Sequence, residues 1–216
     1  ETADADWRLR PSGEGWRVVS PDGATLRLAP AVPGRHNARN ATAALAALAA
    51  LGEAPIDAAR ALASYTGIGR RFEIKGETGG VLVVDDYAHH PSEIRATLRA
   101  VREWYPGRRI WAVFQPHTFS RTKALLGDFA AAFDGADEVM ILDIYASREV
   151  DSLGISSEDL RRLVPGGCHG AGKPGDAADA LADLVRAGDV VVTLGAGDVT
   201  SVGPMLLQCL GQRVIA

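Results

Sequence analysis

The stretch VLVVDDYAHHP, residues 81–91, most constrains what this chain can fold into. Its first four residues are apolar in succession, which predicts a strand buried on both faces of a sheet. The strand runs directly into two carboxylates, an aromatic ring and two histidines. Apolar residues then recur at spacings of four, three and four between 94 and 105, which predicts one buried helix face. Since open parallel sheets bind ligands at the carboxyl ends of their strands, this polar corner is a candidate site.

The rest of the chain after residue 70 alternates between strand and helix patterns. Strands are expected at 72–77, 81–85, 109–114, 138–144 and 189–194, and helices at 92–105, 121–133, 156–163, 176–187 and 199–210. The alternation predicts an α/β fold, with a mostly parallel sheet and helices on both faces. The first two strands, joined around Gly79-Gly80, also suit an antiparallel hairpin.

Residues 1–67 have a different pattern and are expected to form a separate α+β unit. Short alternating segments at 7–10, 15–20 and 24–29 predict a β meander, because Pro-Ser-Gly and Pro-Asp-Gly turns separate them. An alanine-rich helix ending at Gly52 and a second helix from Pro55 to about Tyr65 follow. We place a hinge at Gly67-Ile68-Gly69, so the expected domains are 1–67 and 68–216.

Composition argues against several classes of partner. With 27 acidic and 23 basic residues the net charge is -4, which disfavours a nucleic-acid surface. No apolar run approaches the roughly 18 to 20 residues of a membrane span, and the acidic N-terminus does not resemble a signal peptide. The two cysteines, Cys168 and Cys209, have no disulfide or metal spacing, which favours the cytoplasm. Because the chain begins without Met, we expect a fragment of a longer protein.

Four predicted strands end in a similar way. The corners that follow them are Asp85-Asp86-Tyr87, Gln115-Pro116-His117, Asp143-Ile144-Tyr145 and Gly195-Ala196-Gly197. Because parallel strands point in one direction, these corners are expected along one edge of the sheet, where a ligand would bind.

Several roles remain open for the residues of the first corner. Asp85 and Asp86 are compatible with a magnesium pair, with contacts to ligand hydroxyls or with helix capping. His89 and His90 are adjacent and cannot share a helix face, which argues against a metal site. His90, directly before Pro91, also suits the start of a helix.

Two glycine-rich stretches approach phosphate-binding motifs, and both are incomplete. Residues 167–173 match GxxxxGK[ST] up to its lysine, but Pro174 replaces the hydroxyl residue and no strand leads into them, so a surface loop is expected. Gly195-Ala196-Gly197 follows a strand, but Thr200 occupies the third glycine position and no acidic residue follows about 20 positions on. This disfavours a Rossmann oxidoreductase and favours a close-packed turn.

Other candidates lie near predicted helix starts and the hinge. Asn37 suits the N-cap of the alanine-rich helix, while Asn40, one turn later, favours a ligand near that helix start. Arg70-Arg71 is either a solvated pair or a phosphate contact. His117 and Arg121 flank a helix start, which is a favourable place for an anion.

Five motifs together resemble the Mur ligases. They are PGRHNARNATAA, GIGRRFE, VVDDYAHHPSEI, FQPHTFSRT and GAGDVT, in the order and spacing typical of the family, and the match covers about residues 30 to 200. By the combination of DDYxHHP with FQPHxxSRT, the chain most closely resembles the branch of this family that joins L-alanine to UDP-N-acetylmuramate.

The resemblance implies a Rossmann-like C-terminal domain, preceded by a remnant of a central ATPase domain. It implies an ATP-dependent ligase of cytoplasmic peptidoglycan synthesis that works through an acyl phosphate. The chain lacks a genuine P-loop, so the fragment is not expected to be active alone. Magnesium ligands are expected mainly in the missing portion, with no metal site here. The alternative is a stand-alone nucleotide or amino-acid binding module without catalysis.

The resemblance also implies roles for individual residues. The ATP contacts would be Asn37 and Asn40 near the adenine, Arg71 at a phosphate and Asp86 at the ribose. The amino-acid and acyl-phosphate pocket would consist of Tyr87, His89, His117, Arg121 and the Gly195, Ala196 and Gly197 turn, with His89, His117 and Arg121 as catalytic residues. One departure is Thr118, where many relatives have a basic residue, and this leaves Arg121 as the expected carboxylate partner.

Overall fold

The computed structural model describes residues 5–13, 15–28, 34–65, 69–150 and 152–215. The chain divides into two compact units, residues 1–67 and 68–216, and each is described by itself. Two residues of the predicted hinge, Gly67 and Ile68, lie outside the described residues. No helix in the described ranges is both long enough and apolar enough to cross a membrane.

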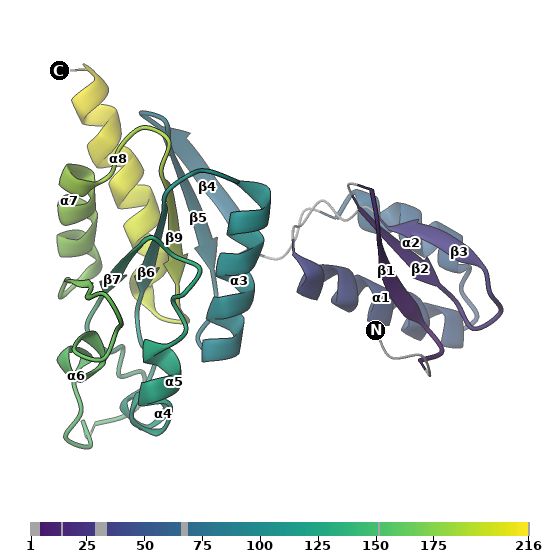
Figure 1. Ribbon diagram of the computed structural model, residues 1–216, viewed down its shortest axis with the longest axis horizontal. Coiled ribbons are helices and arrows are strands. Elements are labelled where there is room, and N and C mark those ends of the chain that lie inside the picture. Colours follow the sequence, from purple (N-terminus) through teal and green to yellow (C-terminus); the bar gives the residue numbers. More distant parts are fainter. Residues whose placement is uncertain (1–4, 14, 29–33, 66–68, 151, 216) are drawn as a thin grey trace. The chain divides into compact units, whose positions relative to one another are not determined.

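The first unit is a three-stranded antiparallel sheet packed on two helices (Figure 1). Its elements are β1 (Arg8–Ser12), β2 (Gly15–Val19), β3 (Thr25–Leu28), α1 (Arg35–Ala50) and α2 (Pro55–Ala63). One sheet face carries Leu9, Val18, Leu26 and Leu28, which pack with α1 and α2 through Ala38, Ala41, Leu45 and Ala59. The meander and both helices agree with the sequence pattern.

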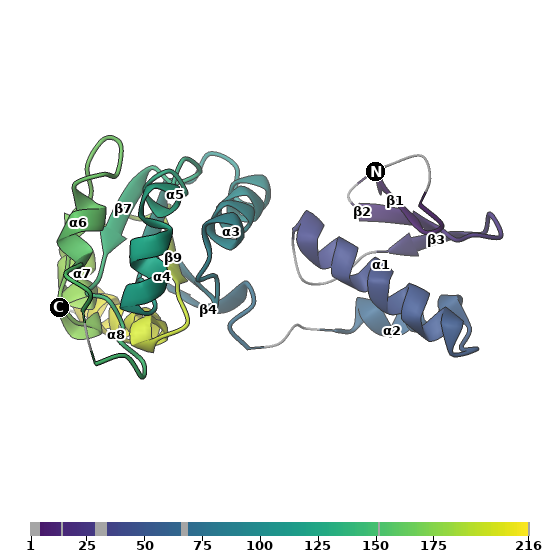
Figure 2. The same cartoon turned by 90° about the horizontal axis from the view of Figure 1, so that it is seen from below.

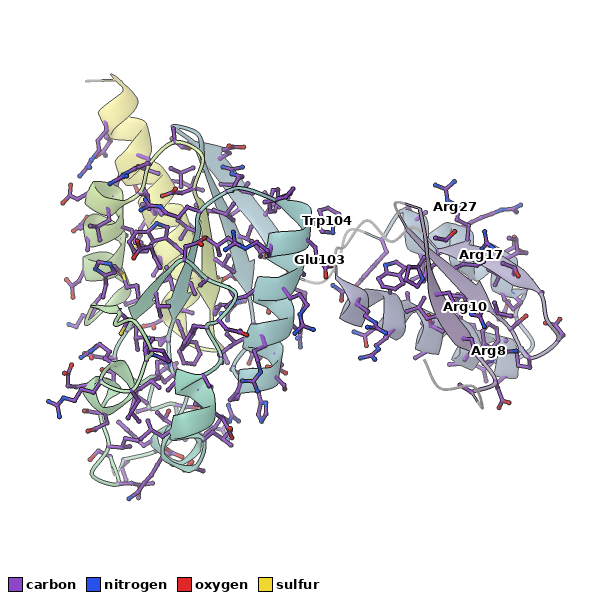
Figure 3. All side chains as sticks on the ribbon, viewed as in Figure 1. Arg8, Arg10, Arg17, Arg27, Glu103 and Trp104 are labelled. Carbon is purple, nitrogen blue, oxygen red and sulfur yellow. The ribbon has the colours of Figure 1, made fainter. Side chains whose placement is uncertain are left out.

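Four arginines share the opposite face of this small sheet (Figure 3). The register places Arg10 opposite Arg17, and Arg17 opposite Arg27, while Arg8 lies two residues before Arg10 on β1. Within the described ranges, none of the four makes a hydrogen bond or an ion pair, and the Nε atom of Arg8 is buried without a partner. Because like charges directly opposite each other destabilise a sheet, this face costs the unit stability.

We therefore expect Arg17→Glu to stabilise the first unit. The change replaces two repulsive cross-strand pairs with two attractive ones, worth about 0.5 to 1.5 kcal/mol in total. Hydrogen exchange of the β1–β3 amides at low salt would measure this gain in stability, and the gain should be smaller in 1 M salt. Arg60→Glu is the matched control, since Arg60 already pairs with Asp57 at 3.2 Å and should not gain from reversal. Equal effects of the two changes would contradict the prediction.

The second unit is built on a six-stranded sheet in the order β4-β5-β9-β6-β7-β8. The strands are β4 (Glu73–Thr78), β5 (Val81–Asp86), β6 (Ile110–Phe114), β7 (Glu138–Ile141), β8 (His169–Gly170) and β9 (Val190–Leu194). All neighbouring pairs from β5 to β8 are parallel, whereas β4 and β5 form the antiparallel hairpin that Gly79-Gly80 suggested. The mostly parallel sheet predicted from the alternation is therefore confirmed.

Helices cover both faces of this sheet (Figures 1 and 2). The helices α7 (Pro174–Leu184) and α8 (Val202–Ile215) pack on the face that carries Val83, Trp111, Val113, Met140 and Val191. On the other face lie α3 (Pro91–Trp104), α4 (Phe119–Ala124) and α5 (Leu126–Ala130), and Phe129 of α5 contacts Phe114 of β6. Alternate side chains of each buried strand thus pack into the cores on the two faces of the sheet, which explains why the strands are continuous apolar runs.

Some boundaries differ from the sequence pattern. The helix expected at 121–133 is two short helices, because Leu125 leaves the helical conformation with φ -115° and ψ 22°. The strand expected at 138–144 ends at Ile141. The surface loop expected at 167–173 contains the two-residue strand β8, which is too short to leave a periodic signal. The remaining elements are α6 (Ser157–Arg161) and the 3₁₀ turn at Asp198–Ser201 that precedes α8.

Candidate functional site

The polar corners after β5, β9, β6 and β7 lie together at one edge of the sheet. The Gly195 amide donates to the Asp86 carbonyl at 3.2 Å, and the Gln115 amide donates to the Leu194 carbonyl at 3.0 Å. The backbone of Tyr145, after β7, is hydrogen-bonded to the corner after β6. Four chain segments far apart in the sequence therefore form one continuous surface at the strand ends, as the topology predicts.

Asp85 holds this edge together from inside. Its side chain is 0% exposed, and it accepts hydrogen bonds from the hydroxyls of Thr193 at 2.6 Å and Thr200 at 2.9 Å. It also pairs with the Arg70 guanidinium at 3.2 Å, and Arg70 donates in turn to the Gly195 carbonyl at 2.6 Å. These contacts are internal to the protein, which favours a structural role for Asp85.

Asp86 fixes the corner that follows β5. One carboxylate oxygen accepts from the Ala88 amide at 2.9 Å and the other from the Phe72 amide at 2.9 Å. Helix capping, one of the roles open for the two aspartates, is wrong, because the N-cap of α3 is His90, whose ring nitrogen accepts from the Ser92 amide. His90 therefore shapes the helix start, as its place before the proline suggested. A ribose contact by Asp86 stays a prediction.

Four aromatic rings form a row along the site. Tyr87 and His89 have ring centroids 5.3 Å apart, His89 and His117 are 6.3 Å apart, and His117 and Tyr145 are 5.5 Å apart. The Nδ1 atom of His89 lies 3.0 Å from the Tyr87 carbonyl, which can only accept, so this nitrogen carries a proton. In the neutral ring the Nε2 atom therefore offers a lone pair.

His117 and Arg121 have buried nitrogens that no protein atom satisfies. Within the described ranges, His117 Nδ1 and Arg121 Nη1 are buried and have no hydrogen-bond partner. Burial lowers the pKa of His117 below its ordinary value of 6.5, the positive charge of Arg121 and that of His89 when its ring is protonated lower it further, and Glu149 opposes them. His117 is therefore neutral at pH 7. Since unsatisfied buried polar atoms are costly, the pair indicates a site for a polar, anionic ligand.

The lowered pKa of His117 predicts how stability depends on pH. Above pH 6.5 the imidazole is neutral in the folded and the unfolded chain, so it contributes no pH dependence. As the pH falls below that value, the unfolded chain binds the proton first, and the folded state loses stability until its own lower pKa is passed. We expect His117→Gln to lose less unfolding free energy than the wild type between pH 7 and pH 5, measured in urea.

An NMR titration gives the control for this prediction. The Arg121→Gln change removes one of the causes that lower the pKa of His117, so the imidazole should titrate at a higher pH than in the wild type. An unmoved titration, or parallel stability curves for wild type and His117→Gln, would contradict the assignment.

The glycine-rich turn after β9 is close-packed and tolerates no side chains. Gly195 has φ +144°, and a Cβ there would lie 2.8 Å from the Gln115 carbonyl. A Cβ on Gly197 would overlap the side-chain oxygen of Gln115 and lie 2.7 Å from Cγ of Tyr145. The side chain of Gln115 fixes the turn. Its Nε2 donates to the Asp198 carboxylate at 2.6 Å, and its Oε1 accepts from the Val199 backbone amide at 3.1 Å. Ala196 lies half-buried between the two glycines.

The other predicted residues are distributed over both units. Tyr87 lies beneath two guanidinium groups, with Cζ of Arg70 5.0 Å and Cζ of Arg71 5.7 Å from its ring centre, and Arg71 is exposed. Asn37 and Asn40 lie in the first unit, three residues apart on α1. The N-cap interpretation of Asn37 is wrong, because the helix begins at Arg35 and Gly34, with φ 99°, is its N-cap.

Sequence reasoning passed over Glu149 as a residue of the site. Its carboxylate accepts from the Ser120 amide at 3.0 Å, which fixes the start of α4 between His117 and Arg121. The hydrogen bond from the Ser120 hydroxyl is the main cause that lowers the pKa of Glu149; burial opposes it, and the Ser120 amide lowers the pKa further, so the carboxylate stays charged. No sequence signal marked it, because it lies 29 residues from Ser120 in an irregular segment. Among the described residues, no group of three or more His, Cys, Asp or Glu side chains could hold a metal ion.

Comparisons with known proteins match most of the chain. The sequence pattern of the Mur ligase, glutamate ligase domain, matches residues 70–197. A UDP-N-acetylmuramate–L-alanine ligase of Paenarthrobacter aurescens (strain TC1) is 48% identical over 209 residues, covering 96% of this chain and 45% of the relative. A protein of the same name from Streptomyces coelicolor (strain ATCC BAA-471 / A3(2) / M145) is 47% identical, and the match covers 98% of this chain and 47% of the relative.

A solved structure of a ligase with this activity in its name also superposes on the chain. The crystal structure of UDP-N-acetylmuramate-alanine ligase from Thermotoga maritima superposes with a TM-score of 0.78 at 26% identity, covering 98% of this chain and 47% of that one. The chain thus spans about half the length of the relatives it matches.

Proposed function

The chain belongs to the Mur ligase family, and on that premise we propose that it is the C-terminal part of an ATP-dependent ligase that joins L-alanine to UDP-N-acetylmuramate. The observation that carries the proposal is the pair of buried nitrogens without protein partners on His117 and Arg121. They lie at the strand-end edge, within residues 70–197, where the family pattern matches. The identities of 47% and 48% to ligases of that name support the choice of amino acid and sugar nucleotide.

The proposed reaction passes through an acyl phosphate. ATP transfers its γ-phosphoryl group to the carboxylate of the sugar nucleotide and leaves as ADP. The amino group of L-alanine then attacks the acyl carbon and loses a proton, and the tetrahedral intermediate expels phosphate. Such chemistry depends mostly on positioning and on neutralising charge. Magnesium bound with ATP would supply charge neutralisation, and its ligands are proposed to lie mainly outside this chain.

The residues of this chain would bind and orient the amino acid. Arg121 presents an unsatisfied guanidinium nitrogen to the alanine carboxylate, for which a planar fork is well suited. The lone pair of His89 Nε2 accepts from the alanine amino group, and neutral His117 adds no opposing charge beside it. Tyr87 and the Gly195–Gly197 turn complete the pocket, and the turn brings backbone close to the acyl phosphate.

Four residues of this chain are proposed as contacts of the adenine nucleotide. We propose Asn37 and Asn40 for the adenine, Arg71 for a phosphate and Asp86 for the ribose. The buried position of Asp86, at 4% exposure, means that it would also support the corner that carries Tyr87. We place the reaction in the cytoplasm, where the sugar nucleotide and ATP are both available.

The test uses the full-length protein. Phosphate release should require ATP, magnesium, UDP-N-acetylmuramate and L-alanine together, and omission of any one should abolish it. Mass spectrometry should show the alanine adduct of the sugar nucleotide. Binding of ATP or L-alanine without turnover, with all components present, would overturn the ligase proposal and favour the alternative, a binding module without catalysis.

A further inference from the structure

Tyr145 fills the space between the two halves of the proposed amino-acid pocket. Its ring stacks on His117, with centroids 5.5 Å apart and planes 25° apart. On the other side it lies against the glycine-rich turn, since a Cβ on Gly197 would lie 2.7 Å from Cγ and 3.0 Å from Cβ of Tyr145. The ring therefore occupies the gap between the corner after β6 and the corner after β9.

The backbone fixes Tyr145 in this position. Its amide donates to the Pro116 carbonyl at 2.8 Å, and its carbonyl accepts from the Thr118 amide at 2.8 Å. Residues 117 and 145 thus form a parallel bridge that extends the β6–β7 pair beyond the end of β7. Although Tyr145 is 38% exposed, its contacts with His117 and Gly197 and its backbone hydrogen bonds hold the ring in place.

The ring also adjoins the atoms that would hold the amino acid. It stacks on the imidazole whose Nδ1 is buried and unsatisfied, and Arg121 is close enough to that imidazole to lower its pKa. An amino acid held by its carboxylate at Arg121 and packed beside His117 has the tyrosine ring as the next surface. In the described part of the chain the Tyr145 hydroxyl makes no hydrogen bond, so its ring, rather than its oxygen, forms this surface.

We propose that Tyr145 is a specificity-determining residue, which limits the side chain of the accepted amino acid to the size of a methyl group. This inference rests on the proposed function, because it assigns a role within the same pocket. Each additional methylene must displace a ring that is held from both sides, and close-packed interiors accommodate such additions poorly.

The experiment compares kcat/KM of the full-length enzyme for L-alanine, L-2-aminobutyrate and L-valine. In Tyr145→Ala we expect the ratio of L-2-aminobutyrate to L-alanine to rise at least about tenfold, since one methylene in an apolar pocket is worth about 10- to 200-fold in discrimination. The change should appear mainly in the KM for the larger amino acid. Tyr145→Phe keeps the ring and is the matched control, with an expected ratio within about threefold of the wild type.

The outcomes separate the two proposals. Wild-type enzyme that does not turn over L-alanine would overturn the proposed function. If the wild-type enzyme turns over L-alanine but Tyr145→Ala leaves the ratio of kcat/KM for L-2-aminobutyrate to that for L-alanine unchanged, only the role of Tyr145 is overturned. If Tyr145→Phe changes this ratio as much as Tyr145→Ala does, the selectivity belongs to the hydroxyl group, and the proposed role of the ring is overturned. If Tyr145→Ala does not fold, Tyr145→Leu tests the same point, because it removes the flat ring but retains bulk, and an unchanged ratio there overturns the role.

Discussion

Replacing Arg121 with alanine in the full-length protein is expected to raise the KM for L-alanine by about 10- to 150-fold. A charge-assisted hydrogen bond to a carboxylate is worth about 1.5 to 3 kcal/mol, and the substitution removes it. The buried Arg121 Nη1 has no partner within the described residues, so the guanidinium is available to the substrate. Steady-state kinetics with saturating ATP and sugar nucleotide would measure the effect.

Two variants give the controls for Arg121. Arg121→Lys keeps the charge but loses the planar fork, so its KM should lie between those of wild type and Arg121→Ala. Arg162→Ala removes an arginine that is 70% exposed and already paired with Glu158, so its KM should be unchanged. An unchanged KM in Arg121→Ala would remove this residue from the pocket.

Replacing Asp85 with alanine is expected to lower the free energy of unfolding by about 2 to 4 kcal/mol. The change leaves the hydroxyls of Thr193 and Thr200 without their acceptor and removes the ion-pair partner of Arg70. Urea unfolding of the second unit would measure the loss, together with hydrogen exchange of the β5 and β9 amides.

The matched control for Asp85 is an exposed ion pair of the same unit. Asp183 is 71% exposed and pairs with Arg213 at 2.6 Å, and such pairs contribute at most about 1 kcal/mol. Asp183→Ala should therefore cost much less than Asp85→Ala. Similar losses in the two variants would show that the buried network does not hold the strand ends together.

Much of the fold follows from patterns that the sequence displays openly. The continuous apolar runs of β5, β6 and β9 predict buried parallel strands, and the polar residues that end them predict the functional edge. His117 and Arg121 could be selected in this way because both flank a helix start after a strand. These predictions need only local periodicity and the direction of the strands.

The interactions that organise the edge could not be predicted in the same way. The bond between Thr193 and Asp85 joins residues 108 positions apart, and it exists only because β9 lies beside β5. The ring of Tyr145 reaches His117 because the chain pairs with β6 after β7 has ended, a path that no local pattern encodes. Asn37 failed as an N-cap because glycine supplies the positive φ with which α1 begins.

The strand order places β9, the last strand along the chain, between β5 and β6. During synthesis, the five earlier strands of this unit emerge from the ribosome before their middle member exists. Until residues 190–194 arrive, β5 and β6 present unpaired inner edges to the cell, and such edges invite aggregation. The complete sheet of this unit can therefore form only after residues 190–194 have left the ribosome.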